Sequence, residues 1–83
     1  MDLIARYRTE LEEICSKHNL LLDEEVLTQR RDKYIQKGRA ECYAFLYHKS
    51  FRDTDIAKAF WKHRTAIIYT LNKHFPYKEL IKR

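Results

Sequence analysis

Apolar residues recur at helical spacing along the first seventeen positions of the chain. Steps of one, three and four positions place such residues on one face of an α-helix. The charged residues of the same segment fall on the other face. We therefore predict an amphipathic helix over residues 3–17. Its apolar stripe consists of Leu3, Ile4, Tyr7, Leu11, Ile14 and Cys15.

Three further segments follow before the middle of the chain. Leucines at 20–22 form a short apolar link, after which Asp23 is placed to cap a brief helix over residues 24–27. Residues 29–34 show no apolar period, which predicts a basic loop or the entry to the next helix. The helical pattern returns over residues 35–47 and predicts a third long helix.

Two helical segments lie close together in the C-terminal part of the chain. Thr54 is expected to cap a short helix, and a second helical pattern runs over residues 64–73. Residues 61–63 between them would form a turn. The stretch 54–74 therefore predicts a helix-turn-helix, and one last helical turn is expected over residues 77–81.

Length and composition limit the possible chemistry. The chain has 83 residues with one glycine and one proline, and this length allows a single domain over residues 1–83. Gly38 alone cannot build the glycine-rich loops that bind nucleotide phosphates. We predict a compact all-α domain of five or six helices, because so few turn residues disfavour β-hairpins. We expect no enzyme, since a small domain offers little room for a water-excluding pocket.

Charge divides the chain into two unequal parts. Residues 1–27 hold three basic and seven acidic residues, a net charge of −4, whereas residues 28–83 hold fourteen basic and five acidic residues, a net charge of +9. A field of this kind attracts polyanions, so nucleic acid is the first partner to consider and an anionic membrane surface the second. A solvated basic surface without a partner remains the alternative.

The cysteines and histidines do not indicate a metal site. Cys15 and His18 are three positions apart, but Cys42 and His48 would lie on nearly opposite sides of a helix. We therefore expect no metal, no cofactor, and two buried thiols rather than a disulfide. No apolar run approaches the length of a membrane span and no leader segment is visible, which suggests a cytoplasmic protein.

Two stretches resemble a known family, the C-terminal DNA-binding domain of the bacterial replication initiator DnaA, whose fold is related to Trp repressor. Residues 26–39, VLTQRRDKYIQKGR, are similar to its short helix end, basic loop and following helix start. Residues 55–69, DIAKAFWKHRTAIIY, are similar to its helix-turn-helix. The resemblance implies a DNA-binding fold of this type, without the family's nucleotide-binding domain.

The resemblance also implies roles for individual residues. Arg31 matches an arginine that enters the minor groove, and Arg39 one that lies near the phosphate backbone. His63 and Thr65 match residues at the start of the recognition helix, where side chains reach base edges. The candidate DNA-binding residues are Arg30, Arg31, Lys33, Arg39, Lys62, His63, Arg64 and Thr65.

Some residues depart from the family pattern or have a simpler explanation. Lys62 stands where the family has a base-reading Asp, Arg64 replaces a small hydroxyl residue, and the turn is about two residues shorter without a Gly-Gly pair. Base readout should therefore differ, since Lys and Arg prefer guanine. His63 could instead be a turn residue, and Trp61 is expected to pack in the core. Helical spacing also favours core-edge positions, rather than base-stacking positions, for Tyr34, Tyr43, Tyr47, Tyr69 and Tyr77.

The leading hypothesis is binding of double-stranded DNA in replication or transcription control, in a protein of phage or mobile-element origin. The alternative is an interaction module on the same scaffold that binds a host replication or transcription protein, with the acidic first helix as its docking surface. A dimer formed through that helix is a third possibility. The oligomeric state is left open.

Overall fold

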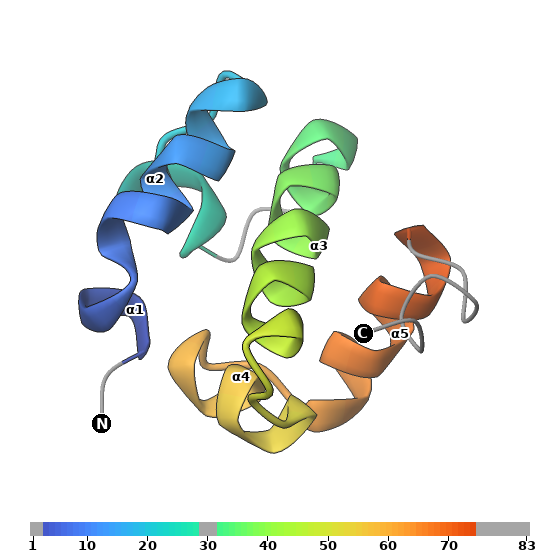
Figure 1. Ribbon diagram of the computed structural model, residues 1–83. Helices are drawn as coiled ribbons and strands as arrows, with labels where there is room; N and C mark the ends of the chain where they lie inside the picture. The colour runs from blue at the N-terminus through green and yellow to red at the C-terminus, as the bar shows by residue number, and fades with distance from the viewer. Residues whose placement is uncertain (1–2, 29–31, 75–83) are drawn as a thin grey trace.

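The computed structural model describes residues 3–28 and 32–74, and in these ranges every regular element is helical (Figure 1). The all-α prediction is confirmed. The helical turn predicted over 77–81 lies outside the described residues. The elements are α1 (Leu3–Arg6), α2 (Arg8–Lys17), the short π-helix η1 (Leu22–Val26), α3 (Lys33–His48), α4 (Asp53–Ala59) and α5 (Arg64–His74).

The helix predicted over residues 3–17 is divided at Tyr7. The backbone of Tyr7 has φ −112° and ψ 22°, which is outside the α-helical region. The Tyr7 ring packs edge-on against Phe45 and Phe51, with 5.8 Å between ring centres in both cases. Periodicity predicted the buried face correctly, but it carried no sign of the break at Tyr7.

The short helix η1 begins earlier than the sequence predicted. It starts at Leu22, and Asp23 does not cap it. The Glu25 carboxylate accepts the N–H of Leu21 at 3.0 Å instead, so a residue inside the helix satisfies a donor at its start. Leu22 and Val26 are both buried, and burying both along one face favours the earlier start.

Helix α3 lies between the other elements, with α2 and η1 on one side and α4 and α5 on the other (Figure 1). It runs two residues earlier and one later than the predicted range 35–47. Gly38 lies against the link that precedes η1, where an added Cβ would collide with the Leu20 side chain. The single glycine therefore permits a close approach between α3 and this link.

A continuous hydrophobic core joins all these helices. Cys15 of α2 and Cys42 of α3 are buried free thiols within it, as predicted. A hydrogen bond between their sulfur atoms lowers the pKa of Cys15 and, together with burial, raises the pKa of Cys42. Tyr43 and Phe60 pack edge-on, 4.9 Å between ring centres, and join α3 to the end of α4.

Within residues 3–28 and 32–74, no group of three or more His, Cys, Asp and Glu side chains is arranged to hold a metal ion. Among the helices at 3–28 and 32–74, none has the length and apolar character needed to cross a membrane.

Candidate nucleic-acid interface

Helices α4 and α5 contact each other and are joined by residues 60–63, in agreement with the predicted helix-turn-helix. The start of α4 differs from the prediction. Thr54 lies inside the first turn of the helix, and Arg52 precedes it. The Asp55 carboxylate accepts the Arg52 N–H at 3.3 Å, so an acid within the first turn satisfies the donor at the helix start.

The turn between the two helices is closed by its backbone. The N–H of Lys62 donates to the carbonyl of Ala57 at 2.9 Å, and Trp61 has the positive φ of 53° that such a helix end requires. Trp61 is 73% exposed, so the expectation that it packs in the core is wrong. Its left-handed backbone turns the side chain away from the helix pair, and Phe60 and Ile67 fill the interior instead.

The start of α5 presents four consecutive exposed residues, which run from His63 to Ala66. The His63 carbonyl accepts the N–H groups of Ala66 and Ile67 at 3.0 and 3.3 Å, so His63 directly precedes the helix. The sequence of α5, RTAIIYTLNKH, contains no acidic residue. An exposed, acid-free helix start offers donors and a positive dipole end to an anion.

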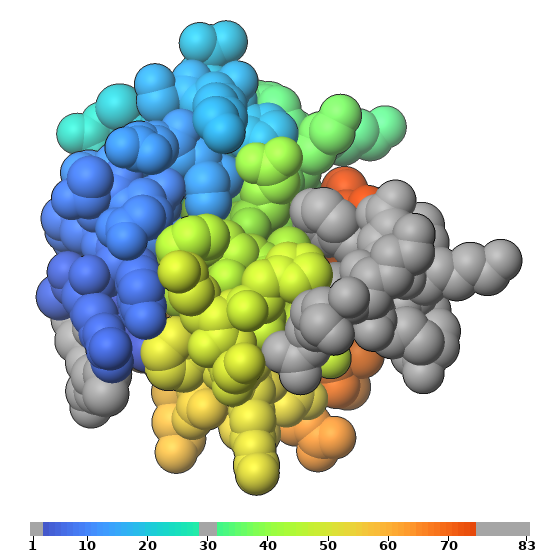
Figure 2. All heavy atoms as spheres, viewed as in Figure 1, coloured from blue at the N-terminus to red at the C-terminus, as the bar shows by residue number. Residues whose placement is uncertain are grey.

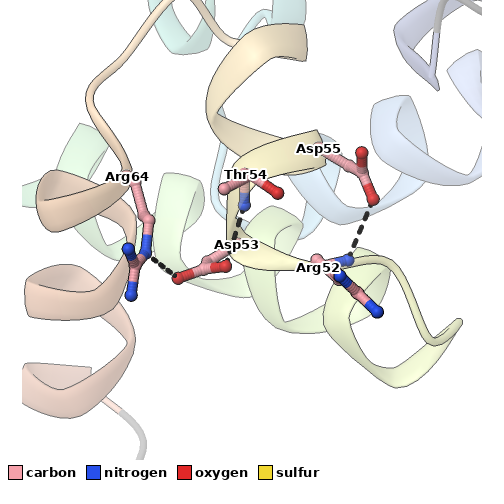
Figure 3. Close-up of polar contacts among 5 residues, drawn as sticks. All are labelled: Arg52, Asp53, Thr54, Asp55 and Arg64. Carbon is pink, nitrogen blue, oxygen red and sulfur yellow. Dashed lines mark hydrogen bonds and ion pairs between the residues drawn. The ribbon is translucent and has the colours of Figure 1, made fainter.

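Arg64 forms an ion pair with the first residue of α4. Its Nε donates to Asp53 Oδ2 at 2.8 Å, while Asp53 Oδ1 accepts the Thr54 N–H at 2.9 Å (Figure 3). The hydrogen bond from Arg64 is the main cause that holds the pKa of Asp53 below its usual value. The Arg64 side chain is nevertheless 66% exposed, so this pair links the starts of the two helices at the surface.

A basic groove of about 910 Å³ lies between α3 and α5. Its lysines come from the start of α3, from the turn and from the end of α5: Lys33, Lys37, Lys62 and Lys73. None of the described residues that line it is acidic. His74 also lines the groove, where burial first and then Lys73 and Lys37 lower its pKa. The basic groove is therefore an electropositive surface carried by lysines.

Arg39 has a different role from the one that the family resemblance implied. It is only 2% exposed, and its Nε donates to the Val26 carbonyl at 2.8 Å. Its Nη2 donates to the carbonyl of Glu25 at 3.2 Å and to that of Thr28. Burial lowers its pKa. Arg39 therefore holds the end of η1 against α3 and is not placed to contact a phosphate in this conformation.

The remaining predicted residues divide into three groups. Lys33 begins α3 and Lys62 lies in the turn, and both line the basic groove. His63, Arg64 and Thr65 lie exposed at the start of α5. Buried Arg39 also contributes to the groove lining, so the structure brings six of the eight predicted residues onto α5, its turn and the adjoining groove. Arg30 and Arg31 lie outside the described residues.

Four residues at this surface were missed by the sequence reasoning: Lys37, Asp53, Tyr69 and Lys73. Lys33 and Lys37 are four positions apart on one helix, and Tyr69 and Lys73 likewise, so helical spacing already placed each pair on one face. Tyr69 is 67% exposed and lines the basic groove, contrary to its expected core-edge position. Tyr34 is also exposed, whereas Tyr43 lies in the core itself and not at its edge.

A second hollow, of about 740 Å³, lies on another part of the surface. It is bordered by α1, η1 and α4, and exposed Trp61 forms part of its lining. Leu3, Leu27 and Phe51 make much of it apolar, while Asp23 and Lys58 contribute opposite charges. Its mixed character contrasts with the basic groove between α3 and α5.

Comparison with known proteins adds no relative, since no family model, curated protein or solved structure matches this chain. The resemblance to the initiator's DNA-binding domain stays a prediction made from the two sequence stretches.

Proposed function

We propose that this protein binds double-stranded DNA through α4, the turn and α5, with the start of α5 in the major groove. The observation that carries the proposal is the combination of an exposed, acid-free helix start with an adjoining groove lined by four lysines. Helix α5 has 11 residues, a length of about 16 Å. An α-helix with its side chains is about 10–12 Å across and the major groove is about 12 Å wide, so the groove admits such a helix.

Two sets of residues have different tasks in this proposal. His63, Arg64 and Thr65 face the bases, because side chains at the start of a recognition helix reach base edges. The lysines of the basic groove hold the phosphate backbone, which fixes orientation and contributes no sequence information directly. The net charge of +9 over residues 28–83 supports association with a polyanion such as DNA. A role in replication or transcription control is the biological context that the sequence resemblance suggests.

The test is fluorescence anisotropy of the full chain with a pool of random duplexes at two salt concentrations. Wild type should bind, and its affinity should fall steeply with salt. The double variant Lys37→Gln/Lys73→Gln should reduce the log–log salt slope by about 1.8, since each phosphate contact contributes about 0.9. Lys17→Gln is a control for loss of one positive charge outside the groove, because Lys17 is exposed at the end of α2. Absence of binding at low salt would refute the proposal.

A second candidate function is docking on a host replication or transcription protein. The observation that favours it is the mixed hollow between α1, η1 and α4, where Trp61 exposes a large aromatic surface. Aromatic residues are enriched at protein interfaces. In this alternative, Trp61→Ala abolishes capture of the partner and leaves DNA anisotropy unchanged, whereas Lys37→Gln/Lys73→Gln has no effect on capture.

A further inference from the structure

The ion pair between Asp53 and Arg64 controls which part of the guanidinium is available. An arginine side chain has five N–H donors, one on Nε and two on each terminal nitrogen. Asp53 Oδ2 accepts from Nε at 2.8 Å. No described residue accepts a hydrogen bond from the two terminal nitrogens, and Figure 3 shows them beside the first turn of α5, on the side of the guanidinium away from Asp53.

The Asp53 carboxylate that accepts the hydrogen bond from Arg64 is itself fixed by a second hydrogen bond. Asp53 Oδ1 accepts the Thr54 N–H at 2.9 Å, so each carboxylate oxygen has one donor. The Asp53 side chain is 26% exposed against 66% for Arg64. A partly covered carboxylate with both oxygens engaged restricts the more exposed guanidinium. Arg64 consequently loses less rotamer freedom when it binds, which favours a contact of defined geometry.

The ion pair also changes what Arg64 contributes to DNA binding. An arginine without a partner moves readily toward the nearest phosphate and strengthens binding to any sequence. Beside Asp53 the pair has no net charge, so its attraction to phosphate is weak. The terminal nitrogens can still donate two parallel hydrogen bonds to O6 and N7 of guanine, the commonest specific contact of arginine in the major groove.

We infer that Asp53 is a positioning residue that directs Arg64 to guanine, so that the DNA site contains a G·C pair opposite the start of α5. This inference rests on the proposed function and deepens it. Asp53 touches no base in this arrangement. It determines specificity through the orientation of Arg64 and lowers the affinity for random DNA.

The experiment begins with selection of the preferred duplex from a random pool by the full wild-type chain. Each guanine of that duplex is then replaced in turn by 7-deazaguanine, which lacks N7. At one position, wild-type affinity should fall about tenfold, within the range for loss of a bidentate base contact. The variant D53N should lose this discrimination while its affinity for random duplexes is retained or increased, with a salt slope steeper by about 0.9.

Two further variants separate positioning from folding. D53S removes the carboxylate, while the hydrogen bond from the Arg52 N–H to Asp55 at the helix start does not involve residue 53. It should behave as D53N does, with the thermal midpoint recorded for each variant. R64A should lose the same discrimination, and D53N/R64A should be no worse than R64A alone.

The outcomes distinguish the two levels of the proposal. Wild-type binding without preference for any guanine overturns the inference and leaves DNA binding intact. The same is true if D53N and D53S discriminate as well as wild type, or if they weaken binding to all duplexes equally. Absence of wild-type binding to any duplex overturns the proposed function and the inference together.

Discussion

Helices α2 and α5 are nearly equal in length, with 10 and 11 residues, yet their exposed surfaces carry opposite charge. Glu10, Glu12 and Glu13 are exposed on α2, whereas α5 has no acid and ends in Lys73 and His74. The two helices lie on different sides of α3 (Figures 1 and 2). Both helices bury an apolar face in the same core, so they differ in the charge of the surface that each exposes to a partner.

The opposite charges on α2 and α5 make the electrostatic potential around the molecule asymmetric. A polyanion is attracted to the α3–α5 side and repelled by α2, so the field orients the domain before any contact forms. Within about 8 Å, the screening length at physiological salt, the lysines of the basic groove dominate. The acidic helix therefore contributes to orientation even without touching DNA.

The largest expected effect comes from Arg39, whose side chain joins α3 to the end of η1. Arg39→Met removes donors from three backbone carbonyls at the end of η1 and should lower the free energy of unfolding by about 3 kcal/mol. Urea unfolding measures it, with exposed Lys37→Met as the control. The DNA salt slope of the folded variant should equal that of wild type. A slope shallower by about 0.9 would instead assign Arg39 a phosphate contact.

Charge reversal on the two helical surfaces tests the contrast directly. Lys37→Glu/Lys73→Glu should weaken duplex binding about a hundredfold, about 2.7 kcal/mol, because two phosphate contacts become repulsive. Glu10→Lys/Glu13→Lys changes the net charge by the same amount on α2 and should strengthen binding by less than about threefold at 0.15 M salt. Anisotropy with one duplex measures both. Equal and opposite effects would show that net charge, and not the basic groove, governs binding.

A smaller effect on stability is expected where the link before η1 packs against α3. Gly38→Ala places a Cβ against Leu20 and should destabilise the fold by about 2 kcal/mol. Chemical denaturation of Gly38→Ala, Leu20→Ala and the double variant measures the coupling between the two sites. The double variant should be less destabilised than the sum of the single ones. Strict additivity would contradict the close approach.

The smallest effect concerns the pair at the start of α4 and α5. Because Arg64 lowers the pKa of Asp53 in the folded state, the pair adds stability above the unfolded pKa of about 3.9 and loses it as pH falls through the lower folded value. Solvent exposure limits the gain to at most about 1 kcal/mol. The stability difference between wild type and Asp53→Asn, from urea unfolding, should decrease steadily as pH falls below about 3.9. A difference that does not change with pH in this range would exclude ionisation of Asp53 as its source.

Hydrophobic periodicity predicted most of the helices, because burial of one face is a property of each segment alone. The same periodicity also indicated that Arg39 is buried, because Arg39 falls on the same face of α3 as Ile35, Cys42 and Leu46. The family resemblance outweighed that signal and assigned Arg39 to the surface. Helix starts were predicted less well, since Asp23 and Thr54 lie inside the helices that they were expected to cap, and Glu25 and Asp55 accept N–H groups that precede these helices.

The sequence by itself determined the all-helical class, the turn between the last two described helices and the separation of acidic from basic residues. Each depends on composition or on spacing within one segment. Only the tertiary structure decided that Lys33 and Lys37 share a groove with Lys62 and Lys73, and that Asp53 holds Arg64. These neighbours come from different helices, so their approach depends on how the helices pack against α3, which no local pattern records.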